Sequence, residues 1–435
     1  MNNNLNIIIL AAGKGTRMKS SKPKVLHKIA NHEMLLHVIN LCSKIKPKNM
    51  FVVLGKDSDS IKTILPKNVK IIIQKEQLGT ANALLSGREI IHKIKGKLLV
   101  LYGDVPLLEK RTLEKLITKS KNNISILGFE SNNPKGYGRI KEKKNNVLEI
   151  IEDKNLKEKD KSIKLCYSGI FCGPTKVVYN LLSKVKKNKS HNEYLLTDIF
   201  KIANDENISI PIIYANEKEV MGVNNMYQLA LAEDCFQDKL RKKFMIKGVN
   251  IQNPQSVFFS FDTKIEPDVS IGPNNIFGKN VVIKRNVFIH GNNNIEETII
   301  NSSSKIGPFC RLRGGNKIGK GVKIGNFVEI KNSYIGDKAK INHLAYIGDA
   351  SVGKNSNIGA GTITCNYDGK IKHKTVIGNY VFIGSNCALV APIKIKDNAF
   401  VAAGSTISKN VGIDDFSIAR AQQKIVKKGR KKFLK

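Results

Sequence analysis

An aliphatic or aromatic residue recurs at every sixth position through the second half of the chain, as at Ile265, Ile271 and Phe277. The recurrence is interrupted near residues 300 and 334 and over 364–375, and about twenty positions are in phase. A period of six matches neither the helical repeat of about 3.6 residues nor the strand repeat of about two. It is typical of hexapeptide repeats, in which each repeat forms one side of a coil and points one aliphatic side chain inward. This half is therefore predicted to fold as a parallel β-helix.

The interruptions predict loops on the surface of the β-helix. Repeat folds accept insertions as loops on one face, and such loops often carry a binding site. The longest interruption contains "TCNYDGKIKHK" at residues 364–374, and "INHLAYIGD" at residues 341–349 precedes it. We therefore expect a functional site of the β-helix around these two segments.

Residues 1 to about 226 are organised differently, because short apolar segments alternate with amphipathic ones. The predicted strands are 6–11, 50–54, 69–73, 97–102, 124–129 and 167–171, and the predicted helices are 33–45, 80–93 and 111–119. This alternation favours an α/β fold with a mainly parallel, doubly wound, Rossmann-like sheet, which binds ligands at the carboxyl ends of its strands. The segments "LAAGKGTR" and "LVLYGDVP" both follow such ends. We expect them to meet in one cleft.

The loop after the first strand combines two glycines with three cations. Gly13 and Gly15 allow backbone N–H groups to form a concave nest for an anion, and Lys14, Arg17 and Lys24 add positive charge. The spacing excludes a P-loop, which requires Gly-Lys-Ser/Thr, and the dinucleotide fingerprint, which requires a third glycine. An ordinary solvated turn is the alternative, but the pattern favours a phosphate-binding loop of another kind.

A segment without glycine or proline, residues 225–247, separates the two halves, and its apolar residues have helical spacing. This pattern predicts a connecting helix. We therefore predict a first domain over 1–226, a linker helix over 227–247 and a β-helix domain over 248–435.

The formal net charge of +37 invites a nucleic-acid or membrane function, but the distribution of charge argues against both. Of the 73 basic residues 63 are lysines, they are spread along the whole chain, and tryptophan is absent. Enrichment in Lys, Asn and Ile together is typical of coding bias on a tolerant surface. No apolar run approaches the roughly 20 residues of a membrane span, and the seven scattered cysteines form no Cys-x-x-Cys pair. We predict a cytoplasmic protein with reduced thiols that binds neither nucleic acid nor membranes.

Motifs from both halves occur together and point to one family. In chain order they are "LAAGKGTRM", "QLGTANAL", "LYGDVPL", "GYGRI", "MGVNN", "NHLAYIGDA" and "NIGAGTITCNYDG". Over essentially the whole chain they resemble the bacterial bifunctional N-acetylglucosamine-1-phosphate uridylyltransferases/glucosamine-1-phosphate acetyltransferases. The resemblance implies that the β-helix is left-handed, that the protein is a homotrimer, and that its product serves peptidoglycan and lipopolysaccharide synthesis.

For the first half, the resemblance implies transfer of UMP from UTP to N-acetylglucosamine 1-phosphate, with release of pyrophosphate. Arg17 and Lys24 are implied to act in catalysis by taking phosphate charge. The implied nucleotide and sugar contacts are Leu10, Ala11, Ala12, Gly13, Lys24, Gln74, Gly79, Thr80, Tyr102, Gly103, Asp104, Gly138, Glu152, Tyr167 and Asn224. Asp104 and Asn224 are implied to hold Mg²⁺, which prefers oxygen ligands and keeps several waters. The chain departs from the family pattern at Tyr167, where the family has asparagine.

For the second half, the resemblance implies acetylation of glucosamine 1-phosphate by acetyl-CoA, with His343 as the general base. The amine must be neutral to attack a thioester, so a base that titrates near neutral pH suits the reaction. The implied sugar-phosphate contacts are Arg313, Lys331, Tyr346 and Asn357, and the implied acetyl-CoA contacts are Ala360, Asn366, Tyr367, Ser385, Ala403 and Arg420. Gly314 stands where proline is usual, and the C-terminal tail lacks tryptophan.

Two other functions are weighed against this one. A nucleotidyltransferase with a single activity and a regulatory β-helix would have no need for His343 or for the long loop that contains Asn366 and Tyr367. A basic scaffold or nucleic-acid-binding protein would show salt-sensitive nucleic-acid affinity and no turnover.

Overall fold

The computed structural model describes residues 4–188 and 192–433. The chain divides into two compact units, Met1–Phe236 and Gln237–Lys435, and the division falls inside helix α9, Met226–Ile246. The three predicted domain limits stay a prediction. Among the described residues, no helix combines the length and apolar character that a membrane span requires.

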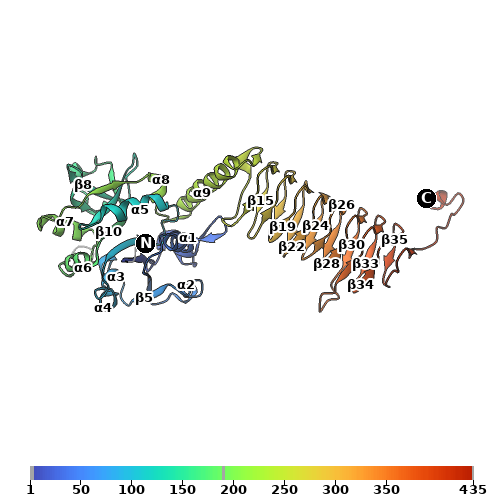
Figure 1. Cartoon of the computed structure of the whole chain (residues 1–435), viewed down its shortest axis with the longest axis horizontal. Helices are drawn as coiled ribbons and strands as arrows, with labels where there is room; N and C mark the ends of the chain where they lie inside the picture. Colours follow the sequence, from blue (N-terminus) through green and yellow to red (C-terminus); the bar gives the residue numbers. More distant parts are fainter. Residues whose placement is uncertain (1–3, 189–191, 434–435) are drawn as a thin grey trace. The chain divides into compact units, whose positions relative to one another are not determined.

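The first unit, drawn in blue to green in Figure 1, contains a nine-stranded sheet whose main path runs β11-β7-β10-β6-β1-β4-β5. The seven strands of this path are β1 Leu5–Leu10, β4 Asn49–Gly55, β5 Lys70–Gln74, β6 Lys97–Tyr102, β7 Ser125–Glu130, β10 Leu165–Pro174 and β11 Ile212–Tyr214. Strands β1, β4, β5 and β6 are mutually parallel, as expected. Strand β10 is antiparallel to both β6 and β7.

The direction of β10 follows from the segment that precedes it. A parallel return needs a crossover of a dozen residues or more, usually a helix. Instead, the hairpin of β8 (Gly138–Lys143) and β9 (Asn146–Ile151) precedes β10, and β8 pairs antiparallel with β10 as well. The sequence pattern did not predict this hairpin.

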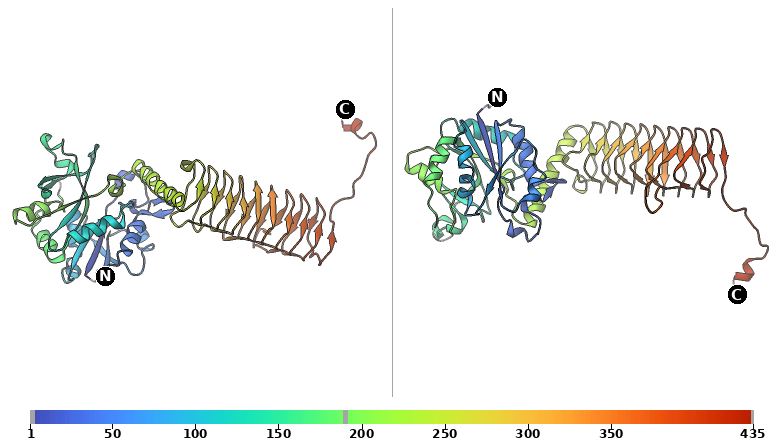
Figure 2. Two further views of the ribbon diagram at one scale, coloured as in Figure 1. Left: turned by 45° about the horizontal axis from the view of Figure 1, so that its top comes forward. Right: turned by 90° about the horizontal axis from the view of Figure 1, so that it is seen from below.

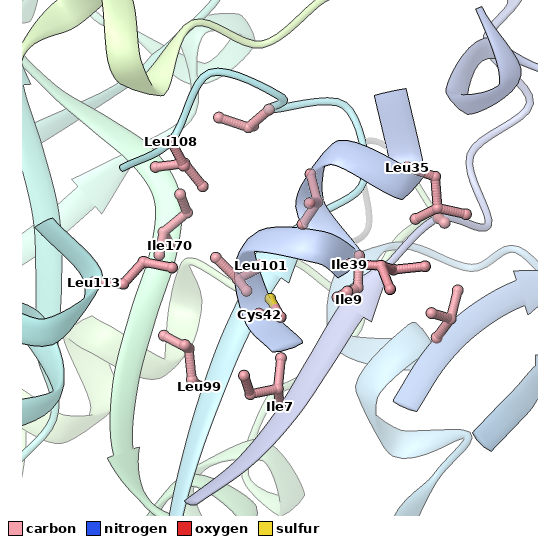
Figure 3. Packing of buried hydrophobic residues seen from close by; sticks show 14 of the residues in the cluster. Ile7, Ile9, Leu35, Ile39, Cys42, Leu99, Leu101, Leu108, Leu113 and Ile170 are labelled. Carbon is pink, nitrogen blue, oxygen red and sulfur yellow. The ribbon is translucent and has the colours of Figure 1, made fainter. Parts of the chain in front are cut away.

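Helices cover both faces of the sheet and create two cores. Ile7 and Ile9 of β1 pack beside α1 (Met34–Ser43), as Figure 3 shows, and the same core contains residues of α5 (Lys110–Lys119). Ile8 and Leu10 face the opposite core, which contains residues of α3 (Thr80–Leu85), α4 (Arg88–Ile91), α6 (Thr175–Ser183) and α7 (Asp198–Asp205). The unit also contains two short helices, α2 (Asp59–Lys62) and α8 (Glu217–Val220), and a two-stranded sheet of β2 (Lys28–Ile29) and β3 (His32–Glu33). Because successive strand side chains alternate between faces, β1 is buried on both sides.

The helix predicted over 80–93 is two helices, with a break before Arg88. The break contains Gly87, where a Cβ atom would lie 2.6 Å from Ile91 Cδ1 and 2.7 Å from Ile72 Cδ1. A larger residue would therefore push this segment away from the sheet.

The second unit is a parallel β-helix of three sheets with ten, eight and eight strands, and the stacked strands are visible in Figure 2. The ten-stranded sheet contains β12 Asn250–Ile251, β14 Ser270–Ile271, β17 Phe288–Ile289, β20 Lys305–Ile306, β23 Lys323–Asn326, β26 Lys340–His343, β29 Asn357–Ile358, β32 Phe382–Ile383, β35 Phe400–Val401 and β37 Phe416–Ser417. Its inward aliphatic residues pair in register from Ile271 to Val401, which confirms the six-residue reading.

The other two sheets complete the coils. The first consists of β13 Lys264–Ile265, β16 Val282–Ile283, β19 Thr298–Ile300, β22 Asn316–Ile318, β25 Tyr334–Ile335, β28 Ala350–Val352, β31 Thr375–Ile377 and β34 Ile393–Ile395. The second consists of β15 Ile276–Phe277, β18 Asn294–Ile295, β21 Arg311–Arg313, β24 Glu329–Lys331, β27 Tyr346–Gly348, β30 Ile363–Cys365, β33 Ala388–Val390 and β36 Thr406–Ile407. A short helix, α10 (Arg430–Phe433), follows near the C-terminus.

Asparagine has two structural roles in the β-helix beyond coding bias. Asn274, Asn280 and Asn286 turn coil corners with φ near +60°, a conformation that asparagine accepts more readily than most residues. Asn275 and Asn293 form a buried ladder, joined by a 2.9 Å hydrogen bond, and their amides also donate to buried backbone carbonyls. Both side chains therefore satisfy hydrogen-bond acceptors of the coil backbone.

Candidate active sites

A cavity of about 480 Å³ opens at the carboxyl ends of β1, β5 and β6. Thirteen of the predicted residues line it, namely Leu10, Ala11, Ala12, Gly13, Arg17, Lys24, Gln74, Gly79, Thr80, Tyr102, Asp104, Glu152 and Asn224. Lys14, Val25, Gln77, Ala83, Lys154, Glu193 and Leu195 line it as well. Segments that are distant in sequence thus form one cleft.

The glycine-rich loop brings Arg17 and Lys24 to the same wall of the cavity. Gly15 has a φ of +64°, and a Cβ atom there would lie 2.7 Å from the Cβ of Lys24. Only glycine combines this backbone conformation with so close an approach. The loop also receives a hydrogen bond from Gln77 Nε2 to the carbonyl of Ala12, at 2.5 Å.

Four charged or polar side chains converge on the floor of the cavity. The Lys24 ammonium is bonded to the Asp104 carboxylate and donates to Asn224 Oδ1 at 3.2 Å. The Arg17 guanidinium donates to the same Asn224 oxygen at 2.8 Å. The carbonyl of Asp104 accepts the N–H of Val223 at 3.0 Å, which ties the two oxygen-bearing loops together.

The oxygens of Asp104 and Asn224 suit a divalent cation of the magnesium type. Mg²⁺ is commonly bound by one or two carboxylates together with substrate phosphates and waters. The ammonium of Lys24 already bonds both side chains, so their oxygens converge on one point where a positive charge is stabilised. Within the described ranges no group of three or more His, Cys, Asp or Glu could hold a metal ion. A metal here would depend on phosphate oxygens for further ligands.

The far end of the cavity is built around Gln74 and Gly79. The buried amide of Gln74 donates to the Gly79 carbonyl at 3.1 Å and to Asn82 Oδ1 at 2.8 Å. Gly79 has a φ of +105°, and a Cβ atom there would lie 2.5 Å from the carbonyl oxygen of Tyr194. The hydroxyl of Thr80 accepts the N–H of Leu196 at 3.1 Å. Residues 194–196 thus close this end.

Two side chains in the cavity have raised pKa values because they are buried. Burial raises the pKa of the Glu152 carboxyl, which accepts a 3.0 Å hydrogen bond from the Thr197 hydroxyl. Burial also raises the pKa of the Tyr102 phenol, and Glu152 and Asp104 add to the shift. At the rim, Lys154 and Glu193 form a 2.9 Å ion pair.

Three predicted contacts, Gly103, Gly138 and Tyr167, do not line the cavity. A Cβ atom on Gly103 would face Leu35 and Ala11 at 3.1 and 3.3 Å, which places this residue beneath the floor. Gly138 pairs with Tyr167, whose ring packs edge-on against Phe200 with centroids 5.3 Å apart. The Tyr167 hydroxyl is buried and has no hydrogen-bond partner among the described residues. Roles for these three residues stay predictions.

Because the Tyr167 hydroxyl is unsatisfied, Tyr167→Phe is expected to leave the first unit equally stable or more stable, by about 1 kcal/mol. Tyr179→Phe is the matched control, because the buried Tyr179 hydroxyl donates to the Leu84 carbonyl at 2.9 Å. Loss of that bond is expected to destabilise by about 1 kcal/mol. Urea unfolding followed by far-ultraviolet circular dichroism measures both. Equal losses of stability in the two variants would show that Tyr167 has a partner.

On the β-helix, His343 and three predicted acetyl-CoA contacts form one row. His343, Ala360, Ser385 and Ala403 each lie two residues after an inward aliphatic residue of the ten-stranded sheet, and those aliphatic residues pair in register. Arg420 extends the row, since its guanidinium donates to the Ala403 carbonyl at 2.7 Å.

Arg313, Lys331 and Tyr346 lie on the neighbouring sheet in consecutive coils. Arg313 forms an ion pair with Glu329, in which Nη2 and Nε donate to the same oxygen, Oε1, at 2.6 and 2.7 Å. The ammonium of Lys372 is the main cause of a lowered pKa of Lys331, and Arg313 adds to it. Three cations thus lie together here, with Glu329 and Asp349 as carboxylate neighbours. Asn357 pairs with Lys340 on the other sheet, so the structure does not bring it beside Arg313.

Polar contacts within the long insertion, and one from it to Asp349, hold the insertion in place. Asn366 Nδ2 donates to Asp349 Oδ2 at 2.5 Å, and the Tyr367 hydroxyl donates to the Gly369 carbonyl at 2.7 Å. His373 and Asp368 form a 2.6 Å contact, which together with backbone N–H groups lowers the pKa of Asp368.

Sequence reasoning did not single out several neighbours of the predicted residues. Glu329 forms an ion pair with Arg313, and Lys372 lowers the pKa of Lys331. Asn326 forms a hydrogen bond with His343. The place of Lys372 in the longest insertion, where a binding site is expected, was the one signal that could have identified it. A second hollow of about 440 Å³ includes Lys372, Asp349 and Asn332 in its lining but none of the predicted residues.

Three family descriptions match parts of the chain. The MobA-like NTP transferase domain matches residues 7–139, the GMPPB C-terminal domain matches residues 294–366, and the bacterial transferase hexapeptide (six repeats) matches residues 374–409.

Full-length relatives carry one common description, bifunctional protein GlmU. The protein from Bartonella bacilliformis is 41% identical over 97% of this chain and 95% of its own length. The protein from Zymomonas mobilis is 43% identical over 98% and 96%, and the protein from Clostridium beijerinckii is 39% identical over 98% and 99%.

Proposed function

The chain belongs to the family of bifunctional GlmU proteins, and on that premise we propose that it makes UDP-N-acetylglucosamine in two steps. The β-helix acetylates glucosamine 1-phosphate with acetyl-CoA. The first unit then transfers UMP from UTP to the N-acetylglucosamine 1-phosphate so formed and releases pyrophosphate. The observation that carries this proposal is the convergence of Lys24, Arg17, Asp104 and Asn224 in a cavity at the strand ends. A cytoplasmic location and a role in cell-wall precursor synthesis belong to the same proposal.

Uridylyl transfer joins two anions, so charge neutralisation and alignment supply most of the rate. A phosphate oxygen of the sugar attacks the α-phosphorus of UTP and forms a P–O bond. The bond between the α-phosphorus and the α–β bridging oxygen breaks, and pyrophosphate leaves with that oxygen. Lys24 and Arg17 line the cavity at the point where they can bind phosphate oxygens. Asp104 and Asn224 would hold Mg²⁺, which supplies further neutralisation of phosphate charge. The base would bind near Gln74 and the sugar near Glu152.

Acetyl transfer needs a neutral amine and a group that accepts its proton. The sugar nitrogen attacks the thioester carbonyl, a C–N bond forms, the C–S bond breaks, and CoA leaves. His343 is the proposed base, and the cations Arg313 and Lys331 are the proposed partners of the sugar phosphate. The row of His343, Ala360, Ser385 and Ala403 would carry the CoA chain away from the base.

Two half-reactions test the proposal separately. With UTP, N-acetylglucosamine 1-phosphate and Mg²⁺, phosphorus NMR should show UDP-N-acetylglucosamine and pyrophosphate. With glucosamine 1-phosphate and acetyl-CoA, a thiol reagent should report free CoA. Release of pyrophosphate without release of CoA would favour a nucleotidyltransferase with a regulatory β-helix.

Metal binding should be tighter in Lys24→Met, because Lys24 competes for the oxygens of Asp104 and Asn224. Removal of one unit charge from within about 4 Å should lower the dissociation constant of Mn²⁺ by roughly tenfold, as measured by titration calorimetry without nucleotide. Lys14→Met is the matched control, because Lys14 lines the same cavity and none of its described contacts is with these oxygens. Equal or weaker Mn²⁺ binding by Lys24→Met would contradict the metal assignment.

We also propose a homotrimer, because the coil faces expose rows of large apolar side chains. Phe382 and Phe400 stack with centroids 4.7 Å apart and are 42% and 43% exposed. Sedimentation equilibrium should give three times the chain mass. A monomer with full acetyltransferase activity would rule the trimer out.

A further inference from the structure

The side chain of His343, at the end of β26, is bonded to Asn326 at the end of β23. The distance from His343 Nδ1 to Asn326 Oδ1 is 2.8 Å, and the two residues are register partners in adjacent coils. In the described part of the chain this is the one side-chain hydrogen bond of either residue. His343 is exposed, so its second ring nitrogen remains accessible.

This contact determines which ring nitrogen carries the proton. An amide oxygen only accepts hydrogen bonds, so Nδ1 of His343 must donate. In a neutral imidazole the other nitrogen, Nε2, then has a free lone pair. A general base needs that lone pair on the side that meets the substrate.

The fold itself does not require the Asn326 amide in this position. The buried asparagines Asn275 and Asn293 use their amides to satisfy coil carbonyls. Asn326 serves the coil through its backbone, because its carbonyl accepts the N–H of Leu344 at 3.0 Å. Its side chain is therefore available to hold His343.

We propose that Asn326 is a positioning residue for acetyl transfer, which holds the neutral His343 imidazole in the Nδ1–H form so that Nε2 receives the proton. The inference rests on the proposed role of His343 as the base. As the C–N bond forms and the C–S bond breaks, the amine proton moves to Nε2. The resulting imidazolium keeps its Nδ1–H bond to Asn326, and CoA leaves with the sulfur electron pair.

Nitrogen NMR of the full-length protein, labelled with ¹⁵N-histidine, tests the tautomer directly. A spectrum of His343→Gln identifies the signals of His343. At a pH where the imidazole is neutral, wild type should show a protonated Nδ1 and an unprotonated Nε2. Asn326→Ala should change to the Nε2–H form that neutral histidine side chains ordinarily prefer. Asn326→Asp retains an acceptor and should keep the wild-type tautomer.

Kinetics provide the second readout. Asn326→Ala should lower kcat for acetylation by about tenfold to a hundredfold, the usual effect of losing a hydrogen bond that orients a reacting histidine. The KM for glucosamine 1-phosphate should stay within a few-fold, and Asn326→Asp should restore much of the rate. Asn379→Ala is the matched control, because Asn379 forms a similar exposed bond with Asp397 at 3.1 Å and, like Asn326, does not have a positive φ. This control should keep full activity.

An Nε2–H tautomer in wild type would overturn the inference, even if Asn326→Ala failed to fold. Conversion of Asn326→Asp to the Nε2–H form would also overturn it, because an acceptor at position 326 would then not hold the proton on Nδ1. Full acetylation by His343→Ala would instead overturn the role of His343, whatever the tautomer.

Discussion

Replacement of His343 by alanine is expected to lower acetylation of glucosamine 1-phosphate by roughly a hundredfold to ten-thousandfold, the usual contribution of a positioned base. The loss should appear in kcat, because Arg313 and Lys331 rather than the imidazole are the proposed phosphate partners. Uridylyl transfer from supplied N-acetylglucosamine 1-phosphate should be unchanged, since that cavity is lined entirely by residues of the first unit. Separate assays of CoA release and pyrophosphate release measure the two rates.

Two controls distinguish loss of the base from structural damage, namely the oligomeric state of His343→Ala and the activity of a second histidine variant. His343 is exposed on the coil surface, so the alanine variant should keep the sedimentation behaviour of wild type. His290→Ala, an exposed histidine of an earlier coil, should acetylate normally. A His343→Ala protein that acetylates within a few-fold of wild type would refute the assignment.

Replacement of Asp104 by alanine is expected to lower uridylyl transfer by about a hundredfold or more and to leave acetylation intact. The variant loses the one carboxylate proposed to bind the metal, and it also loses the ion-pair partner of Lys24. Both losses weaken stabilisation of phosphate charge in the transition state by several kcal/mol. Rates should be compared at limiting and at saturating Mg²⁺.

Asp59→Ala is the matched control for Asp104. Asp59 also pairs with a lysine, Lys62 at 2.7 Å, but its side chain is 91% exposed and lies outside the cavity. Exposed pairs of this kind contribute little to stability. Wild-type uridylylation by Asp104→Ala at limiting Mg²⁺ would mean that the metal ligand lies elsewhere.

The sequence was sufficient to predict the structural features that depend on local periodicity. The inward positions of the β-helix follow from the six-residue spacing, since a coil cannot bury a polar side chain without a partner. The cavity residues near Gly13 and Asp104 follow from strand ends, because parallel strands place their carboxyl ends at one edge.

Features that depend on pairing between distant residues were not predictable. The antiparallel direction of β10 results from the hairpin before it, and β-strand patterns carry no direction. Asn326 and His343 are 17 residues apart, whereas an uninterrupted coil of three repeats places partners such as Ile271 and Ile289 18 apart. The interruptions shift the register of neighbouring coils, and the outward partners change with it. Sequence periodicity marks the inward residues but not these outward contacts.

The central claim is that one chain carries two chemically independent sites in series. The most direct test supplies glucosamine 1-phosphate, acetyl-CoA, UTP and Mg²⁺ to His343→Ala, to Asp104→Ala and to an equal mixture of the two, and quantifies UDP-N-acetylglucosamine by mass spectrometry. Neither variant alone should form the product at more than about a hundredth of the wild-type rate. The mixture should recover it, because N-acetylglucosamine 1-phosphate released by Asp104→Ala is the substrate of His343→Ala. A mixture that stays inactive, or a single variant that makes the product at the wild-type rate, would contradict the account.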